Sequence, residues 1–339
     1  MSFDAFRGIA IIAVVAIHAI PWKLSRCEIY LSYRQMLNFA VPSFIFMSGY
    51  WMAKKTEGIT GADYINFLRR RLLRVMIPFL FWSLVYFGYA VAKMHDINVA
   101  QMPLMFFTGK YTYHLYFVVV IAQLYILTVP LNFIDSRPYG FISILMLNMV
   151  GLFIIYYFCL SGYWRTYANF HKINSPFYEW VIFYYIGLRL GKADDEIYIP
   201  RNIHGFIMHA LLIAIVISMM EAIIISKCKH GEMSDSALKF SSFIYSTCII
   251  FCFLALRERL QTLPRFLVIL GEYSFGVYLM HGIILRGLVK VFHNVHVLYS
   301  FQVLYEFIIV SMTLVICCSV IAVSRKLLPR PIYSKVLGF

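Results

Sequence analysis

Long apolar stretches recur from one end of this sequence to the other, and they constrain the fold more than any other feature. Of the 339 residues, 61% are hydrophobic and only 14% are charged, against roughly 25% charged residues in soluble domains. The spaces between the stretches are too short for a soluble domain of any size. The sequence therefore predicts an integral membrane protein.

A membrane-spanning helix needs about 20 mostly apolar residues, and about ten segments approach this length. Helices are expected because each one satisfies its own backbone hydrogen bonds within lipid. The predicted spans are Phe3–Trp22, Leu37–Ala53, Leu72–Ala92, Leu115–Phe133, Phe141–Leu160, Phe177–Gly191, Gly205–Ile225, Phe240–Leu256, Phe266–Leu285 and Phe301–Val323. We expect an all-α protein whose residues 1–339 form one polytopic bundle of about ten transmembrane helices, without an appended soluble domain. The longest predicted loops are residues 54–71 and 93–114.

The distribution of lysine and arginine predicts which side of the membrane each end of the chain occupies. With the N-terminus inside the cell, the inner loops hold 17 of the 30 Lys and Arg residues and the outer loops hold 12, with Arg7 left aside. The densest basic segment, residues 69–74, then lies inside. We expect a multi-pass protein of the plasma membrane with both termini in the cytoplasm.

Net charge and cysteine content exclude other classes of protein. A formal charge of +14 would suggest nucleic-acid binding in a soluble protein, but here the basic residues lie in short loops, where they set topology and meet anionic lipid head groups. Most of the cysteines lie inside apolar stretches, where a thiol behaves as a small hydrophobe. Cys248 and Cys252 share a helix face, but no second Cys/His pair at metal-ligand spacing accompanies them. We expect a lipid bilayer around the protein, no nucleic-acid partner and no metal, and the sequence leaves a homo-oligomer open.

Two ionisable residues in the first predicted span, Arg7 and His18, are the strongest functional candidates, because ionisable side chains inside a membrane are costly. Their separation of eleven positions corresponds to about three helical turns and ~16 Å, so both lie on the same helix face. Arg7 is then near the inner boundary and His18 in the outer half. Asp4, one turn before Arg7, can hold its guanidinium in place. The alternative is that Arg7 only reaches the head groups and His18 only bonds a neighbouring helix.

A basic group lies at the inner side of the third predicted span, near the level of Arg7. Its members are Arg69, Arg70, Arg71 and Arg74. The planar guanidinium is suited to binding phosphate, so the group predicts an anion site. For Arg69 and Arg70, setting the topology of the loop is an equally good explanation. Arg74 is harder to explain in that way, because it lies one turn into the span.

Four further ionisable residues fall near the level of His18 on the outer side. They are His114, Glu221, His281 and Glu306. A carboxylate beside His18 would fix its tautomer and stabilise the imidazolium, as the acid of a catalytic triad does. The sequence does not say which carboxylate converges on His18. For Glu221, a position facing the lipid head groups is the preferred interpretation.

Five segments, in chain order, resemble the motifs of the acyltransferase-3 family of integral membrane O-acyltransferases. They are residues 4–10 (DAFRGIA) with His18, residues 44–50 (FIFMSGY), residues 69–74 (RRRLLR) with Pro78 and Trp82, residues 114–117 (HLYF), and residues 270–274 (LGEYS) with Tyr278 and His281. Tyr116 stands where the family commonly has tryptophan. The resemblance covers nearly the whole chain, and five motifs in order are far more specific than the arginine–histidine pair alone.

The resemblance implies a membrane enzyme with ten spans that transfers an acyl group, commonly acetyl, from acyl-CoA to a hydroxyl of an envelope glycan or glycolipid precursor. Acyl-CoA is then a co-substrate, and no permanently bound cofactor is expected. Some members of the family carry an extra soluble domain after the last span. This chain stops at Phe339, shortly after its last predicted span, so a relay through such a domain is not expected.

A mechanism follows from joining the resemblance to the predicted depths of these residues. We expect the phosphates of cytosolic acyl-CoA to bind the four arginines Arg7, Arg69, Arg71 and Arg74. The pantetheine arm then runs along the first helix and presents the thioester to His18, the general base. The other candidates, which support the base or donate to the oxyanion, are Asp4, Ser48, His114, Tyr278, His281 and Glu306. A covalent acyl-histidine is an alternative route.

Two other functions are compatible with the sequence. A polysaccharide exporter or flippase would use a polar path through the bundle, but the chain has no Gly-x4-Gly-Lys-[Ser/Thr] loop to power transport. A proton-coupled transporter would use buried His and Glu residues, but no inverted repeats or paired broken helices are visible in the sequence. Acyl transfer by the purified protein would distinguish the enzyme from both.

Overall fold

The computed structural model describes residues 2–20, 27–56, 61–92, 114–163, 166–167, 176–193, 199–228, 233–292 and 302–339. Within these ranges every regular element is a helix, and there is no strand. This confirms the predicted all-α class. Except for His114, the predicted loop 93–114 lies outside the described residues.

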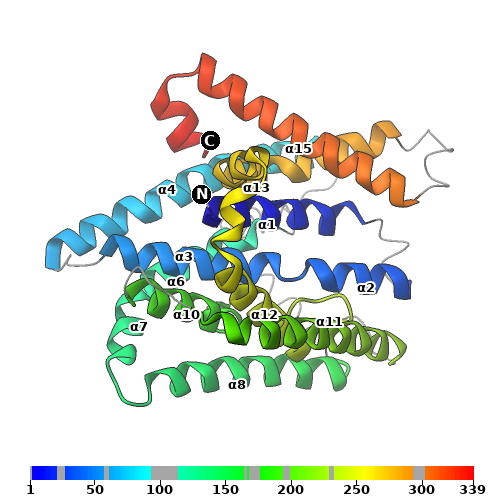
Figure 1. The fold of residues 1–339 in the computed structure, drawn as a ribbon. Helices are drawn as coiled ribbons and strands as arrows, with labels where there is room; N and C mark the ends of the chain where they lie inside the picture. Colours follow the sequence, from blue (N-terminus) through cyan, green and yellow to red (C-terminus); the bar gives the residue numbers. More distant parts are fainter. Residues whose placement is uncertain are drawn as a thin grey trace.

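Twelve α-helices make up most of the described chain. They are α1 (Ser2–Ala19), α2 (Glu28–Leu37), α3 (Ala40–Thr56), α4 (Gly61–Val91), α6 (Tyr116–Ile126), α7 (Thr128–Asp135), α8 (Gly140–Leu160), α10 (Val181–Lys192), α11 (His204–Lys227), α12 (Phe240–Leu256), α13 (Arg265–Phe292) and α15 (Gln302–Leu327). The 3₁₀ turns η3 (Phe177–Glu179), η4 (Arg201–Ile203) and η6 (Arg259–Thr262) and the π-turn η7 (Ile332–Val336) complete the described elements. In Figure 1 the helices form one layered bundle with α8 at one edge, α15 at the other and α1 between α13 and α3.

Six helices of the described chain are long and apolar enough to cross a membrane: α1, α4, α8, α11 with its preceding turn, α13 and α15. The pair α6 and α7, bent by 52°, would make a seventh span. Each of the ten predicted spans has a helical counterpart, but α3, α10 and α12 have only 17, 12 and 17 residues. These lengths are short for a crossing of about 30 Å of hydrocarbon. The predicted number of ten crossings is therefore not confirmed.

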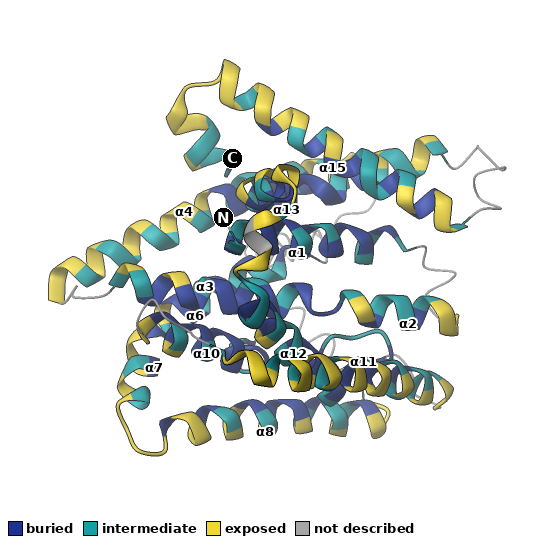
Figure 2. Ribbon diagram, in the orientation of Figure 1, coloured by how far each residue is buried: buried dark blue, intermediate teal, exposed yellow. Residues whose placement is uncertain are grey.

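Apolar side chains on the outside of the bundle agree with a membrane environment. Figure 2 shows exposed residues along α8 and α11, while α1 is largely buried. On α11 the exposed residues include Phe206, Leu212, Ile213 and Val216. Apolar surface on this scale is unusual for a monomeric soluble protein, whereas lipid covers it without cost.

Three local features differ from the sequence prediction. The predicted span Leu115–Phe133 is broken after Ile126, because Pro130 has no N–H to continue the hydrogen-bond ladder to residue 126. Most of the predicted loop 54–71 is helical, since α4 begins at Gly61 and projects beyond its neighbours (Figure 1). The polar residues of this first part lower its hydropathy without preventing a helix. The extra helix α2 falls between the first two predicted spans.

Glycines let the central helices pack with their backbones in contact. A Cβ on Gly8 of α1 would meet the carbonyl of Leu267, and a Cβ on Gly271 of α13 would meet the carbonyl of Asp4. Helices α3 and α10 approach in the same way, with backbone contacts at Gly49 and Gly187. Close approach through small residues is a common way to join helices inside a membrane, where the hydrophobic effect does not drive association.

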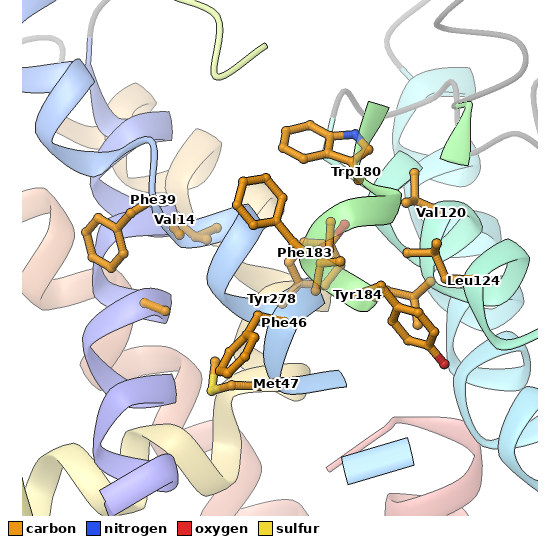
Figure 3. Close-up of a cluster of buried hydrophobic side chains, with 14 of the residues drawn as sticks. Val14, Phe39, Phe46, Met47, Val120, Leu124, Trp180, Phe183, Tyr184 and Tyr278 are labelled. Atoms are coloured by element: carbon orange, nitrogen blue, oxygen red, sulfur yellow. The ribbon is translucent and has the colours of Figure 1, made fainter. Parts of the chain in front are cut away.

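Large side chains fill the space around these contacts. Figure 3 shows Val14 of α1, Phe46 and Met47 of α3, and Phe183 of α10 within one buried cluster. The same view includes Val120 and Leu124 of α6 and Tyr278 of α13. The core therefore joins the helices that carry most of the family-like motifs, and it holds those motifs at fixed positions relative to one another.

A buried polar network attaches α2 to the rest of the bundle. Lys239, just before α12, donates to Gln35 Oε1 of α2 at 2.7 Å. Ser242 and Ser218 donate to the same oxygen at 3.2 and 3.3 Å. Burial lowers the pKa of Lys239 to about 7, even though nearby Glu221 and Asp235 oppose this shift. The lysine is thus near its titration point at neutral pH.

Replacing Gly271 with Val should destabilise the protein. Because the added side chain overlaps the backbone of Asp4, we expect the free energy of unfolding to fall by about 1–3 kcal/mol or more. Thermal unfolding of the purified protein in detergent measures the effect. Gly287→Ala, in the same helix but with nothing within 4 Å of its added Cβ, is the control and should be neutral or slightly stabilising. Equal melting temperatures for Gly271→Val and wild type would contradict this packing.

The titration of Lys239 should be visible as a pH-dependent stability difference between wild type and Lys239→Met. The pKa is lowered in the folded protein, so between about pH 7 and 10.5 the unfolded chain binds more protons, and the wild type gains stability as the pH rises. Below about pH 7, Lys239 is protonated in both states, so it lowers the free energy of unfolding by an amount that does not change with pH. The measurement is the melting temperature of both proteins at pH 6 and pH 9. The melting temperature of the wild type minus that of the variant should be larger at pH 9 than at pH 6. A difference that is independent of pH would refute the lowered pKa.

Candidate active site

Three of the predicted arginines line one cavity, which we call the arginine pocket. It encloses about 240 Å³ between five helices. The lining residues are Arg7 of α1; Phe44, Met47, Ser48 and Trp51 of α3; Arg71, Arg74 and Val75 of α4; Phe117, Val118, Ile121 and Tyr125 of α6; and Ser274, Phe275 and Tyr278 of α13. The pocket thus combines guanidinium groups with an apolar wall, which suits a ligand with anionic and apolar parts.

Arg7 is held at the pocket by contacts on both sides. Its Nη2 donates to Ser274 Oγ of α13 at 3.0 Å, and its Nη1 lies 3.7 Å from Asp4 Oδ1, one turn earlier in α1. The Asp4–Arg7 pairing agrees with the sequence prediction. The contact with Ser274 exists because the glycine packing brings α1 against α13. The guanidinium is therefore fixed by a helix that lies far away in the sequence.

Arg71 and Arg74, three positions apart on α4, point to the same side and reach the pocket. The Arg71 guanidinium lies over the Tyr125 ring, with its carbon 5.5 Å from the ring centroid. Its Nε is buried and has no hydrogen-bond partner within the described part of the chain. Arg69 and Arg70 are exposed and do not line the pocket. The structure thus divides the predicted basic group, with Arg71 and Arg74 at the pocket and Arg69 and Arg70 outside it.

Two hydroxyl groups predicted as oxyanion donors are already in hydrogen bonds. Ser48 Oγ is 3.0 Å from the Tyr125 hydroxyl, and either atom can donate. The Tyr278 hydroxyl donates its proton to the backbone carbonyl of His114. Tyr278 therefore positions the segment that carries His114, and Ser48 is the better placed of the two to offer a proton within the pocket.

Three predicted histidines come together in what we call the histidine cluster: His18 of α1, His114 just before α6, and His281 of α13. The ring centroids of His18 and His281 are 5.3 Å apart, those of His114 and His281 are 4.5 Å apart, and those of His18 and His114 are 6.1 Å apart. His114 and His281 are buried. Within the described ranges, no group of His, Cys, Asp or Glu residues has a metal-binding arrangement. Because imidazole titrates near neutral pH, three neighbouring imidazole rings make the cluster a candidate for proton transfer.

Tyr278 connects the pocket to the cluster. It lines the arginine pocket, and its ring centroid is 5.6 Å from that of His114 and 6.0 Å from that of His281. On α13 the residues Ser274, Tyr278 and His281 follow at spacings of four and three, so they lie along one face. The guanidinium groups and the histidines thus occupy successive levels of one site along α1 and α13.

The two candidate carboxylates on the outer side are placed elsewhere. Glu306 of α15 is buried beside Tyr30 of α2. Glu221 of α11 accepts hydrogen bonds from Tyr156 and from the Ser241 backbone N–H, the latter at 3.2 Å, so it joins α11 to α8 and α12 rather than facing lipid head groups. The rings that lie beside His18 are those of His281 and His114.

Some residues of the site were not singled out from the sequence. Ser274 stands inside the late motif and could have been found from its place one turn before Tyr278. Tyr125, which contacts both Ser48 and Arg71, is one of 25 tyrosines and carries no local signal. Tyr86 of α4, whose hydroxyl is 3.4 Å from His114 Nε2, likewise carries no local signal in the sequence.

Comparison with known proteins identifies the class. The family model "Acyltransferase domain" matches residues 2–323, so this chain belongs to that family of membrane acyltransferases. YfiQ of Bacillus subtilis, named as a membrane-bound acyltransferase, is 22% identical over 263 residues, covering 74% of this chain and 69% of its own. No solved structure matches significantly.

Other relatives carry a different name. A Staphylococcus aureus protein (strain MRSA252) named as a poly-β-1,6-N-acetyl-D-glucosamine export protein is 21% identical over 262 residues, which cover 75% of this chain and 71% of that protein. A Staphylococcus epidermidis protein of the same name is 22% identical over 274 residues, which cover 78% of this chain and 74% of that protein. This chain is therefore similar both to a protein named for acyl transfer and to proteins named for glycan export.

Proposed function

We propose that this membrane acyltransferase moves an acetyl group from cytosolic acetyl-CoA to a hydroxyl of a cell-envelope glycan or glycolipid precursor, with His18 as the general base. The observation that carries the proposal is the continuity of the site, because Tyr278 borders both the arginine pocket and the histidine cluster. A donor with phosphates at one end and a thioester at the other fits such an arrangement. The names of the staphylococcal relatives support a glycan as the acceptor.

Binding of the donor depends on the arginines. Arg7, Arg71 and Arg74 provide three guanidinium groups at the pocket, and planar guanidinium groups bind phosphate through paired hydrogen bonds. The apolar wall, including Phe117 and Val118, would contact the pantetheine arm. The predicted orientation puts the N-terminus and the entry of the pocket on the cytoplasmic side, where acyl-CoA is made. The N- and C-terminal ends lie close together in Figure 1, consistent with termini on one side.

The reaction is a direct transfer. The acceptor oxygen attacks the thioester carbonyl carbon while His18 takes the hydroxyl proton. The tetrahedral intermediate collapses, the carbon–sulfur bond breaks, and the CoA thiolate leaves with the proton that His18 returns. Ser48, with its hydroxyl at the pocket, is the candidate donor to the developing oxyanion.

Export of a glycan is the second candidate function, because the staphylococcal relatives are named for it. The two activities differ in what they consume. Acyl transfer releases free CoA from acyl-CoA and labels the acceptor, whereas export moves the glycan without using acyl-CoA. Purified protein in liposomes, supplied with radiolabelled acetyl-CoA and an envelope glycan fraction, separates the two. Label in the glycan supports the enzyme, and glycan movement without label supports export.

Replacing His18 with Ala should abolish acetyl transfer without lowering the amount of folded protein. Loss of a positioned general base costs roughly 10²–10⁴ in rate. The measurement is release of free CoA and label incorporation by the purified variant. His209→Ala is the matched control, since His209 is exposed on α11 and its Nδ1 bonds to the Gly205 carbonyl within the same helix. Normal activity of His18→Ala would exclude His18 as the base.

Neighbouring arginines of α4 offer a matched test of the donor site. Arg71→Gln should raise the KM for acetyl-CoA by at least about tenfold, because it removes a charge at the pocket worth on the order of 1.5–3 kcal/mol in a hydrogen bond to phosphate. Arg70→Gln removes the same charge one position away, where the side chain is exposed and outside the pocket, and should change KM little. Equal effects of both substitutions would point to general electrostatic attraction instead of a defined site.

A further inference from the structure

His281 carries an imidazole nitrogen whose role the proposed function leaves open. Its Nδ1 lies 2.7 Å from the Tyr278 carbonyl oxygen and 3.3 Å from the Val277 carbonyl oxygen. Carbonyl oxygens only accept hydrogen bonds, so Nδ1 carries the proton and Nε2 of the neutral ring carries the lone pair. That nitrogen is buried and has no hydrogen-bond partner within the described residues. A buried acceptor without a donor is uncommon and suggests a partner that arrives during function.

The hydrogen bonds of His114 assign it a different role. Its Nε2 is 3.4 Å from the Tyr86 hydroxyl oxygen, and that hydroxyl donates its own proton to the Leu279 carbonyl at 3.0 Å. His114 must therefore donate through Nε2 to be bonded to Tyr86. In addition, its backbone carbonyl accepts from Tyr278. These contacts hold His114 in place. Of the two rings, that of His281 lies nearer to His18, with centroids 5.3 Å apart against 6.1 Å for His114.

We propose that His281 is the positioning partner of His18: its Nε2 lone pair accepts a hydrogen bond from His18 once His18 has taken the acceptor proton. The two rings are nearly parallel, at 20°, with centroids 5.3 Å apart, which is close enough for two imidazoles to share a hydrogen bond. This proposal rests on the proposed function. It assigns to a neutral histidine the role that a carboxylate has in a catalytic triad.

The proton balance of the step is simple. The acceptor hydroxyl loses its proton to His18, which becomes an imidazolium with two N–H groups. One N–H carries the transferred proton, and the other donates to Nε2 of His281. When the carbon–sulfur bond breaks, His18 gives a proton to the CoA thiolate, and both histidines return to the neutral form. His281 keeps its Nδ1 proton, bonded to Tyr278, throughout.

The surroundings favour a neutral partner over a charged one. The titratable and charged groups that face His18 within the described ranges are His281 of α13, His114 before α6 and Arg34 of α2. Arg34 is permanently charged and repels the imidazolium, and either histidine would do the same if it were protonated. The cluster can therefore hold one extra proton at a time, since two positive charges at this distance in a low-dielectric interior repel strongly. A neutral lone pair stabilises that single proton without adding a permanent charge to the membrane interior.

The test compares His281→Leu, which removes the lone pair, with His281→Gln, which keeps an acceptor oxygen close to the Nε2 position. For His281→Leu, kcat should fall roughly 10- to 100-fold, less than the ~10⁴ of an ionic triad acid, because a neutral acceptor stabilises the imidazolium less. The KM for acetyl-CoA should stay within about twofold, as the arginine pocket is intact. His281→Gln should retain more of the rate than His281→Leu. His209→Gln, at the exposed histidine of α11, is the control and should match wild type.

The dependence of kcat on pH distinguishes positioning from a purely structural role. Without the lone pair that His281 supplies, protonated His18 is less stable, so the acid side of the kcat profile should move to lower pH in His281→Leu, with a smaller shift in His281→Gln. If His281→Leu does not fold, as judged by its melting temperature, the role of His281 is tested by whether the acid side of the kcat profile of His281→Gln moves to lower pH. A folded His281→Leu with unchanged kcat and profile, or with a uniform loss at every pH, overturns the role of His281 while the proposed function stands. Absence of acetyl transfer by wild type overturns both.

Discussion

The contact between α1 and α13 is the constraint on which the rest of the site depends. Gly8 and Gly271 have no side chain, so the two backbones approach until the carbonyls of Leu267 and Asp4 fill the space where a Cβ would be. That approach brings Arg7 within hydrogen-bond distance of Ser274, and it places His18 beside His281. One helix pair therefore positions both ends of the site, the guanidinium at one level and the imidazoles at another.

Ionisable groups inside a membrane protein are stable only when neighbouring polar groups satisfy them. The site meets this requirement in two ways. Arg7 is bonded to Ser274 and paired with Asp4, and the hydroxyl groups of Tyr86 and Tyr278 hold His114. Some buried polar atoms depart from the pattern and lack a hydrogen-bond partner among the described residues, and they include the Nε of Arg71 and the Nε2 of His281. These two atoms lie at opposite ends of the site, one where an anion would bind and one where a proton would move.

Membership of the acyltransferase family agrees with this division of the site. The proposed reaction, with a donor made inside the cell and an acceptor outside it, requires that binding and reaction occur at different depths. Helices α1 and α13 both run past the two levels, and α4 and α6 close the pocket around them. The fold thus joins the arginine pocket and the histidine cluster within one set of helices.

The sequence by itself determined relations within single helices, because the 3.6-residue period follows from local hydrogen bonding. It predicted that Asp4 supports Arg7, that Arg7 and His18 share a face, and that apolar runs become helices. Relations between helices were decided only by packing. Packing placed Arg71 and Arg74, but not Arg69, at the pocket. It placed the histidines beside His18 and Glu306 beside α2. It also formed the helix α2 where the sequence suggested a loop. The physical reason is that an inter-helix contact depends on every side chain and glycine between two axes, and the period of a single helix does not contain that information.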